Sequence, residues 1–268
     1  MTLLHIAVLA IVQGITEFLP ISSSAHLVLV PVFFRWPDQG LIIDVAVHIG
    51  TLLAVILYLW RDLWAMVVGL GRAVRGKRDA GAVLFFYLVA ATVPVGVAGF
   101  ALHRYMPSGI RSLAIIGWTS LGFGVVLYVA DKIGMTLRRL EHVKLADAVI
   151  IGLAQALSLI PGTSRSGITM TAARILGMER PDAARFSMLL SIPTIAGAGV
   201  LVGWDLYKQG SAELTLAAGL AALLAFVCAL VAIALMMAWL RRATFTPFVV
   251  YRVALGGFLL AVAYGVFS

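Results

Sequence analysis

The amino-acid sequence predicts an all-α polytopic membrane protein, and its composition is the first reason. Of 268 residues, 62% are hydrophobic and 12% are charged, and the mean hydropathy is +1.04. Soluble domains are roughly half apolar and a quarter charged, so a soluble globular protein and a disordered chain are both excluded. The single cysteine, Cys228, excludes an intrachain disulfide and a cysteine metal cluster.

Long apolar segments are the second reason for this fold class. A transmembrane helix needs about 20 predominantly apolar residues, and six segments meet that requirement. The clearest of them has no charged residue between Glu213 and Arg241. The expected spans are 41–60, 80–101, 112–130, 183–203, 214–240 and 247–267.

Two further apolar regions are interrupted by polar residues. Residues 3–34 contain an acid, a proline and the serine run 22–24, and residues 145–177 contain the polar run 161–167. Irregular backbone at membrane depth is tolerated only where protein or a water-filled cavity satisfies its polar groups. We therefore expect each region to form a re-entrant hairpin of two short helices.

Each hairpin is followed by three ordinary spans, which indicates an internal repeat. The run that starts at Gln13 is similar to the run that starts at Gln155, at a shift of about 142 residues. Because a hairpin returns to its starting side, each repeat crosses the membrane three times, and the second repeat is inverted relative to the first. We expect one membrane domain, 1–268, with a first repeat over 1–130 and a second over 145–268.

Basic residues in the loops predict the orientation. Fourteen lysines and arginines fall in the expected loops 61–79, 131–144, 174–185 and 241–242, against four on the opposite face. Cytoplasmic loops carry the excess of basic residues. We therefore expect the fourteen in the cytoplasm and both chain termini outside.

Ionisable side chains within membrane segments are costly and are usually functional. Asp44 and His48, one helical turn apart, could extend a site from the next span or hydrogen-bond each other within the bundle. Asp147 is expected at a solvated helix start, and Arg252 is expected to snorkel from the end of the last span. The candidates are Glu17, His26, Asp44, His48, Asp147, Arg165 and Arg252.

The first hairpin offers a carboxylate, a hydroxyl run and an imidazole within ten residues. Gln13 and Glu17 are four residues apart, so they share one face of a helix. Glu17, the serines at 22–24 and His26 could supply a base, a nucleophile and an acid. The alternative is a polar tip whose side chains only cap short helices.

The second hairpin favours a phosphate site. The run Pro-Gly-Thr-Ser-Arg-Ser-Gly over 161–167 places hydroxyls and glycines around Arg165, just before an apolar helix that begins at Ile168. N–H groups at a helix amino terminus together with a guanidinium bind phosphate. Alternatively, Arg165 only neutralises Glu17 inside the protein. If both residues face one phosphate site, the two tips must approach within a few ångströms.

These motifs resemble those of the bacterial undecaprenyl pyrophosphate phosphatases of the bacitracin-resistance type. Residues 13–26 resemble the family's first motif, which begins with Glu or Gln and has Glu four residues later. Residues 161–167 resemble its second motif, Pro-Gly-x-Ser-Arg-Ser-Gly, and residues 245–252 resemble its closing helix. Ala25 stands where a glycine is common. The resemblance covers almost the whole chain.

The resemblance implies hydrolysis of undecaprenyl pyrophosphate to the monophosphate carrier of cell-wall synthesis, and hence bacitracin resistance. It implies a multi-pass protein of the bacterial cytoplasmic membrane whose site opens to the periplasm. The implied catalytic residues are Glu17, Ser23, His26 and Arg165. Ser23 is the preferred nucleophile, ahead of His26 or an activated water. The same motifs contribute phosphate-binding candidates at Ser22, Ser24, Thr163, Ser164, Ser166 and Gly167.

Cofactor and partner expectations also follow from the resemblance. A divalent cation, Mg²⁺ or Ca²⁺, would be held near Gln13 and Glu17, because hard cations prefer oxygen ligands. The expected partners are a polyprenyl pyrophosphate lipid and the bilayer, with no nucleic acid, and a homodimer is left open. A transporter or flippase of a polyprenyl phosphate lipid is the alternative function, because inverted repeats with broken helices are common among transporters.

Overall fold

The structure is a computed structural model that describes residues 2–36, 40–105, 112–209 and 212–266. These residues form helices and no β-strands, apart from one isolated bridge between Arg138 and Met178. The all-α prediction is therefore confirmed. The α-helices are α1 Leu3–Thr16, α2 Ser23–Phe34, α3 Gly40–Tyr58, α4 Trp60–Ala73, α5 Ala80–Tyr105, α6 Leu113–Ile133, α7 Leu145–Ala156, α8 Arg165–Ile175, α9 Arg180–Gln209, α10 Ala212–Leu240 and α11 Thr246–Ala263, with 3₁₀ turns η1 Leu140–His142 and η2 Leu157–Leu159.

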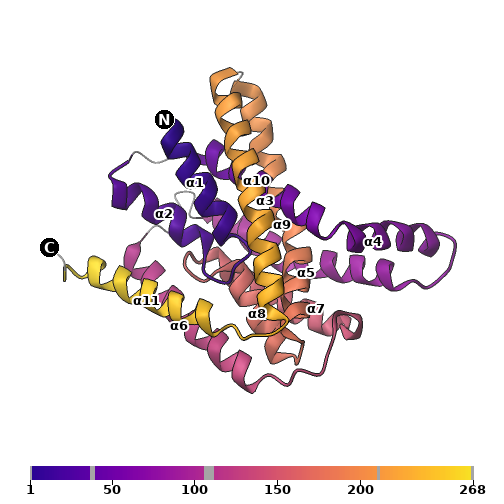
Figure 1. Cartoon of the computed structure of the whole chain (residues 1–268). Coiled ribbons are helices and arrows are strands. Elements are labelled where there is room, and N and C mark those ends of the chain that lie inside the picture. The colour runs from indigo at the N-terminus through magenta and orange to yellow at the C-terminus, as the bar shows by residue number, and fades with distance from the viewer. Residues whose placement is uncertain (1, 37–39, 106–111, 210–211, 267–268) are drawn as a thin grey trace.

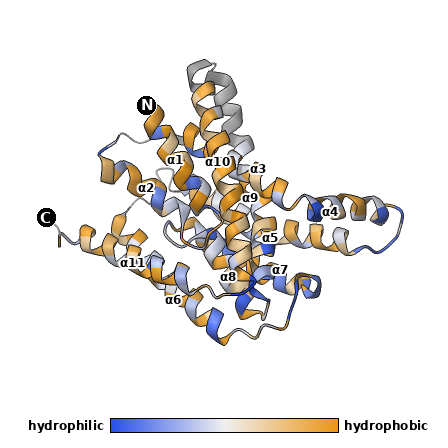
Figure 2. Cartoon of the chain, viewed as in Figure 1, coloured by the Kyte–Doolittle hydropathy of each residue, from blue (hydrophilic) through white to orange (hydrophobic). Residues whose placement is uncertain are grey.

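Several of these helices are suited to a bilayer. Within the described residues, four are long and apolar enough to cross a membrane, in α5, α6, α10 and α11, and a fifth span results if α3 and α4 count as one. Their outer faces are largely hydrophobic (Figure 2). Large exposed apolar surface of this kind marks a membrane contact rather than a water-facing one. The multi-pass assignment is confirmed. The count of six spans stays a prediction, because many side chains in the second half of α9 are not among those that the structure describes.

The expected loop over 61–79 is wrong for most of its length. α3 ends at Tyr58, and after a bend of 74° the chain continues as α4. Buried or half-buried residues recur along α4 at helical spacing, and Met66 and Gly69 are its most buried positions. α4 packs on α5, and Figure 1 shows the two helices projecting side by side from the rest of the molecule. The hydropathy of this segment does not indicate a span, because only one face of α4 packs against protein and the other face carries exposed and charged residues.

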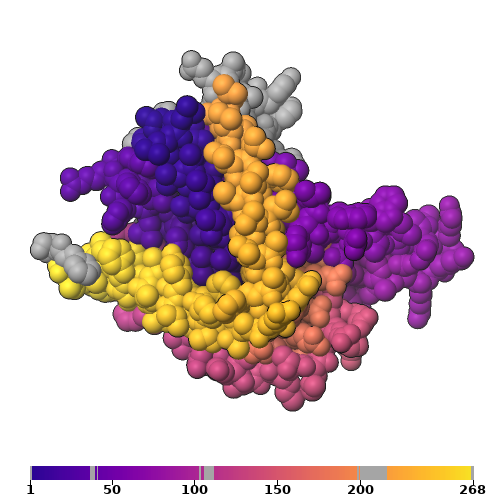
Figure 3. Space-filling view, in the orientation of Figure 1, coloured from indigo at the N-terminus to yellow at the C-terminus, as the bar shows by residue number. Residues whose placement is uncertain are grey.

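Both interrupted regions form the expected pairs of short helices. α1 and α2 meet at one polar tip, and α7 and α8 meet at the other, with η2 between them. α1 packs on α10 (Figure 3) and α7 packs on α5, while α6 pairs with α11. If α1 corresponds to α7 and α5 corresponds to α10 in the two repeats, the α1–α10 pair and the α7–α5 pair are equivalent. The inverted orientation of the repeats, the repeat boundaries and the re-entrant position of the hairpins stay predictions.

Arg174, at the start of the expected loop 174–185, is not a loop cation. It lies in the last turn of α8 with a fully buried side chain, and its Nε donates to Asp131 Oδ1 at 3.1 Å. Its other nitrogens donate to the carbonyl oxygens of Asp131, Gly134 and Met178. A buried guanidinium requires this many acceptors. Arg174 therefore joins the ends of α6 and α8 and is not a loop charge.

Asp147 is also more buried than expected. Its carboxylate accepts both a hydrogen bond from the Lys144 backbone N–H and a bidentate pair from Arg138, in the segment between α6 and α7. The hydrogen bond to this carboxylate raises the pKa of Arg138 above its ordinary value. Asp147 thus anchors the start of the second hairpin rather than facing solvent.

Candidate active site

The two hairpin tips share an unusual backbone conformation. Ser22 and Ser164, 142 residues apart, have φ angles of 73° and 69°, and each immediately precedes the second helix of its hairpin. Positive φ is uncommon outside glycine and costs about 1–3 kcal/mol. The hydroxyl of Ser22 lies 3.2 Å from that of Ser24, and the hydroxyl of Ser164 lies 3.2 Å from that of Ser166. The same local geometry therefore occurs twice.

Glu17 links the two tips. Its Oε1 accepts a hydrogen bond from Arg165 Nη2 at 2.8 Å, across 148 residues of sequence. Its Oε2 accepts from Ser23 Oγ at 2.7 Å and from Gln13 Nε2 at 2.8 Å. The expected approach of the tips is confirmed. Glu17 is nearly completely buried, so these donors and the Arg165 charge compensate for its lost solvation.

The Glu17–Arg165 ion pair is what we expect if Arg165 only neutralises Glu17 inside the protein. However, the pair lies on the wall of a cavity. The cavity has a volume of about 320 Å³. The Arg165 side chain is 14% exposed, so it is not sealed inside the protein. Polar lining residues come from both hairpins and from α3 and α9: Glu17, Ser23, Ser24, Asp44, His48, Ser158, Ser164, Arg165 and Thr194.

Asp44 and His48 extend the site from α3. His48 Nε2 lies 3.6 Å from Glu17 Oε2. His48 Nδ1 lies 2.6 Å from the backbone carbonyl oxygen of Asp44. Of the two interpretations of this pair, the structure favours the one that adds both residues to the cavity.

Two cavity residues were missed by the motifs. Ser158 lies in η2, and Thr194 lies in α9 one residue after a proline. A signal for Thr194 was present, because the run from His48 to Thr51 is matched by the run from Ser191 to Thr194 at nearly the repeat shift. Ser158 likewise lies in the run from Gln155, where the repeat shift matches it to Thr16.

His26 is not brought to this cavity. Its Nε2 lies 2.5 Å from the Tyr251 hydroxyl of α11, and its Nδ1 lies 2.7 Å from the Ser22 carbonyl oxygen. The two rings stack with centroids 5.6 Å apart. The imidazole therefore connects α2 to α11, and no contact places it beside the Glu17 carboxylate.

Several phosphate-binding candidates support the tips without lining the cavity. Ser166 Oγ donates to the Leu19 carbonyl oxygen at 2.8 Å and so joins the second tip to the first. The Gly167 N–H donates to Ser164 Oγ at 3.1 Å, which caps α8. Thr163 is fully buried, and its hydroxyl has no partner within the described residues. Ser22 likewise does not line the cavity.

Arg252 does not snorkel, contrary to expectation. Its side chain is fully buried, and its guanidinium donates to backbone carbonyl oxygens only. These belong to Ser120 of α6, Pro20 of the first tip, and Gly162 and Thr163 of the second tip, at 2.8–3.4 Å. The three segments lie far apart in sequence, so hydropathy gave no sign of this contact.

A preformed protein metal cluster is not present among the described residues. They contain no group of three or more His, Cys, Asp or Glu side chains suited to a metal ion. Gln13 directs its amide nitrogen, and not its oxygen, to Glu17, so the two side chains do not present a shared pair of oxygen ligands. The cavity does hold two carboxyl groups, Glu17 and Asp44.

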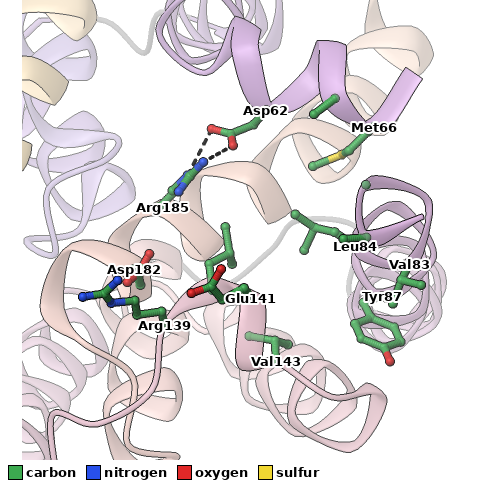
Figure 4. Close-up of a pocket in the computed structure, with 14 residues that line it drawn as sticks. Asp62, Met66, Val83, Leu84, Tyr87, Arg139, Glu141, Val143, Asp182 and Arg185 are labelled. Carbon is green, nitrogen blue, oxygen red and sulfur yellow. Dashed lines mark hydrogen bonds and ion pairs between the residues drawn. The ribbon is translucent and has the colours of Figure 1, made fainter. Parts of the chain in front are cut away.

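A second, larger cavity of about 520 Å³ lies between α4, α5, α9 and η1 (Figure 4). Its charged residues are partly paired, and Asp62 accepts two hydrogen bonds from Arg185. It contains no residue of either motif. Of these two cavities, the one at the tips is therefore the one that contains residues of both motifs.

Comparisons with known proteins agree with this assignment. The family model described as bacitracin resistance protein BacA matches residues 6–258. A protein of Rhodospirillum rubrum named undecaprenyl-diphosphatase 1 is 55% identical, over 98% of this chain and 96% of its own. Undecaprenyl-diphosphatases of Roseobacter denitrificans and Moorella thermoacetica are 54% and 46% identical, over 98% of this chain in each case and over 100% and 98% of their own lengths. The chain, with both tip motifs in one cavity, therefore belongs to the bacitracin resistance protein BacA family.

Proposed function

We propose that this protein hydrolyses undecaprenyl pyrophosphate to undecaprenyl phosphate and inorganic phosphate, and so recycles a lipid carrier of cell-wall synthesis. The observation that carries the proposal is the meeting of Glu17, Ser23 and Arg165 on one cavity wall. A carboxylate, a hydroxyl and a guanidinium are the groups that phosphoryl transfer uses for proton transfer, attack and charge stabilisation. The names of the relatives favour a diphosphatase over a flippase.

Arg165 would bind the pyrophosphate. Only its Nη2 is engaged by Glu17 among the described residues, so the other N–H groups of its planar fork can reach phosphate oxygens. The hydroxyls of Ser24 and Ser164 line the same cavity and can donate to further oxygens. The bilayer would hold the prenyl chain, because each buried CH₂ stabilises the bound lipid by about 0.8 kcal/mol.

Ser23 is the nucleophile that the geometry favours. Its hydroxyl already donates to Glu17, so the carboxylate can take the proton as Oγ attacks the terminal phosphorus. The bond from that phosphorus to the bridging oxygen breaks, and undecaprenyl phosphate leaves. Water then hydrolyses the phosphoserine and releases inorganic phosphate. His26 is disfavoured as nucleophile because it contacts Tyr251 instead.

A divalent cation fits this site only together with the substrate. Mg²⁺ is commonly held by one or two carboxylates plus substrate phosphates. Glu17 and Asp44 would be the protein ligands, and the ion would supply charge neutralisation to the pyrophosphate oxygens. Gln13 would act by orienting Glu17.

The finer placement of the protein is also part of the proposal. The excess of basic residues in the loops predicts that both termini lie outside, and the family resemblance implies a bacterial cytoplasmic membrane protein whose site opens to the periplasm. Replacing Cys228 and introducing Arg75→Cys tests this with an impermeant thiol reagent. We expect no labelling in intact spheroplasts and labelling after lysis. Efficient labelling of intact spheroplasts contradicts the topology. A homodimer stays a prediction.

Phosphate release by the purified protein tests the activity. Wild type in detergent should release phosphate from undecaprenyl pyrophosphate, and Arg165→Ala should release almost none. Arg185→Ala, at the second cavity, is the matched control and should retain activity. A wild-type protein that moves the lipid across vesicles but releases no phosphate would instead support the flippase.

A further inference from the structure

Arg252 and Arg174 are two fully buried arginines with different surroundings. Arg174 has a carboxylate partner, Asp131, at the end of α8 remote from the tip. Arg252 lies at the tips and donates to four carbonyl oxygens without any carboxylate partner within the described residues. A buried charge compensated only by carbonyl dipoles is costly. A stabilising ion pair therefore does not explain why an arginine is buried at residue 252. The orientation of the carbonyl groups that it contacts does explain it.

The contacts of Arg252 fix the direction of peptides in the second tip. Its Nη2 attracts the Gly162 and Thr163 carbonyl oxygens, at 3.1 Å and 2.8 Å. The peptide bonds are trans, so the N–H on the other side of each planar unit points the opposite way. The N–H of Ser164 therefore points away from Arg252, and Ser164 lines the cavity.

The N–H groups that follow have no internal acceptor. Within the described residues, no hydrogen bond is made by the backbone N–H of Ser164, Arg165 or Ser166, whereas that of Gly167 is capped by Ser164 Oγ. Unsatisfied N–H groups at the start of a helix attract anions. This holds for α8, whose first residue is Arg165.

We infer that Arg252 is a positioning residue that holds the second tip so that its backbone N–H groups face the phosphate of the substrate. The inference rests on the proposed function and adds a backbone anion site to it. The contact to Pro20 extends the same control to the first tip. Arg252 itself does not touch the substrate, since its side chain is fully buried beneath the tips.

Substitution by lysine separates this role from a structural one. Arg252→Lys retains the charge but loses the planar fork, so it cannot orient the same set of carbonyl groups. We expect kcat/KM to fall about 100-fold, as for loss of one backbone or side-chain donor from an oxyanion site. We also expect the rise in Tm that inorganic pyrophosphate causes in the wild type to become smaller, because Arg165 still binds the anion while the backbone N–H groups no longer do.

Arg174→Lys is the matched control. It alters an equally buried arginine at the other end of α8, so it should lower Tm. The kcat/KM of the folded protein should change by no more than about 3-fold, because distant sites without shared partners are nearly independent. It should also retain the pyrophosphate-dependent rise in Tm. Equal loss of kcat/KM in both variants would mean that Arg252 is only structural, and the inference would be overturned.

Gly167→Ala provides a second test if Arg252→Lys does not fold. A Cβ at residue 167 would lie 2.6 Å from Arg252 Nη1 and 3.1 Å from both Cβ and Oγ of Ser164, so it crowds the guanidinium and the cap of α8 without removing the charge of Arg252. We expect a lower kcat/KM and a smaller pyrophosphate effect on Tm. Unchanged values of both in Gly167→Ala overturn the inference. The Tm measurement needs no turnover, so it still tests the anion site if the wild type fails to release phosphate and the proposed function is wrong.

Discussion

The two hairpins have a similar backbone but carry different chemistry. Both tips have a serine with positive φ followed by a helix, and both have a pair of serine hydroxyls 3.2 Å apart. At the repeat shift of 142, Glu17 is matched by Leu159 and Ser23 is matched by Arg165. The first hairpin therefore contributes the carboxylate and the hydroxyl, and the second contributes the guanidinium. Neither hairpin holds a complete site, so the chemistry depends on their contact.

The hairpins also differ in burial. Every residue of α8 from Ser166 to Arg174 is buried, whereas α2 buries only Ala25 and Leu27. The second tip is held by Arg252, Thr119 and the Ser166 contact to the first tip. The side of the cavity that contributes Arg165 is thus held by the core, and the side that contributes Ser23 lies nearer the periphery. Preorganised donors stabilise developing charge best when they are held rigidly.

The largest expected effects come from separate substitutions of Ser23 and Arg165, which occupy matched positions in the two hairpins. Ser23→Ala should lower kcat by roughly three orders of magnitude or more and leave substrate binding intact, because the guanidinium remains. Arg165→Lys should weaken both binding and turnover, because the fork contacts substrate in the ground state and the transition state. Steady-state kinetics with a separate binding measurement distinguish the two. Near-normal turnover of Ser23→Ala would make a water activated by Glu17 the leading nucleophile.

A smaller contrast is expected between Gln13 and Gln155, which are both fully buried. Gln13 donates to Glu17, and the amide of Gln155 has no partner in the described structure. Gln13→Ala should lower kcat/KM roughly 10-fold, consistent with loss of one hydrogen bond to a charged group. Gln155→Ala should change kcat/KM by less than about 3-fold and leave Tm unchanged or raised, because it removes an unsatisfied polar group. Equal effects of the two substitutions on kcat/KM would mean that the hairpins are functionally alike.

The smallest contrast concerns the two tip serines. Ser164 Oγ caps α8 through the Gly167 N–H, whereas Ser22 makes no side-chain cap bond to α2. Ser164→Ala should therefore lower the free energy of unfolding by about 1 kcal/mol, the usual cost of a lost N-cap. Ser22→Ala should cost clearly less. Melting temperatures in the same detergent compare the two, and a larger loss for Ser22→Ala would show that the first tip depends on its serine in another way.

Composition and motif spacing were sufficient for the fold class and for the contact between the two hairpin tips. Apolar content and long uncharged runs determine that the helices contact lipid, because charged residues are too costly there. The interrupted segments predicted the two helix pairs, since proline and polar clusters end apolar helices. The motifs also placed Glu17, Ser23 and Arg165 correctly together, because two polar tips in an apolar protein stabilise each other by contact.

Only the tertiary structure decided which buried charges belong to the site. His26, Arg174 and Arg252 have partners on other elements, at Tyr251, Asp131 and three separate backbone segments. The sequence likewise predicted a loop where α4 lies, and the tertiary structure shows a helix that packs on α5. Periodicity and spacing report the neighbours of a residue along one element. The carbonyl groups around Arg252 come from three separate segments, at Pro20, Ser120 and residues 162–163, so their meeting is a property of the assembled fold.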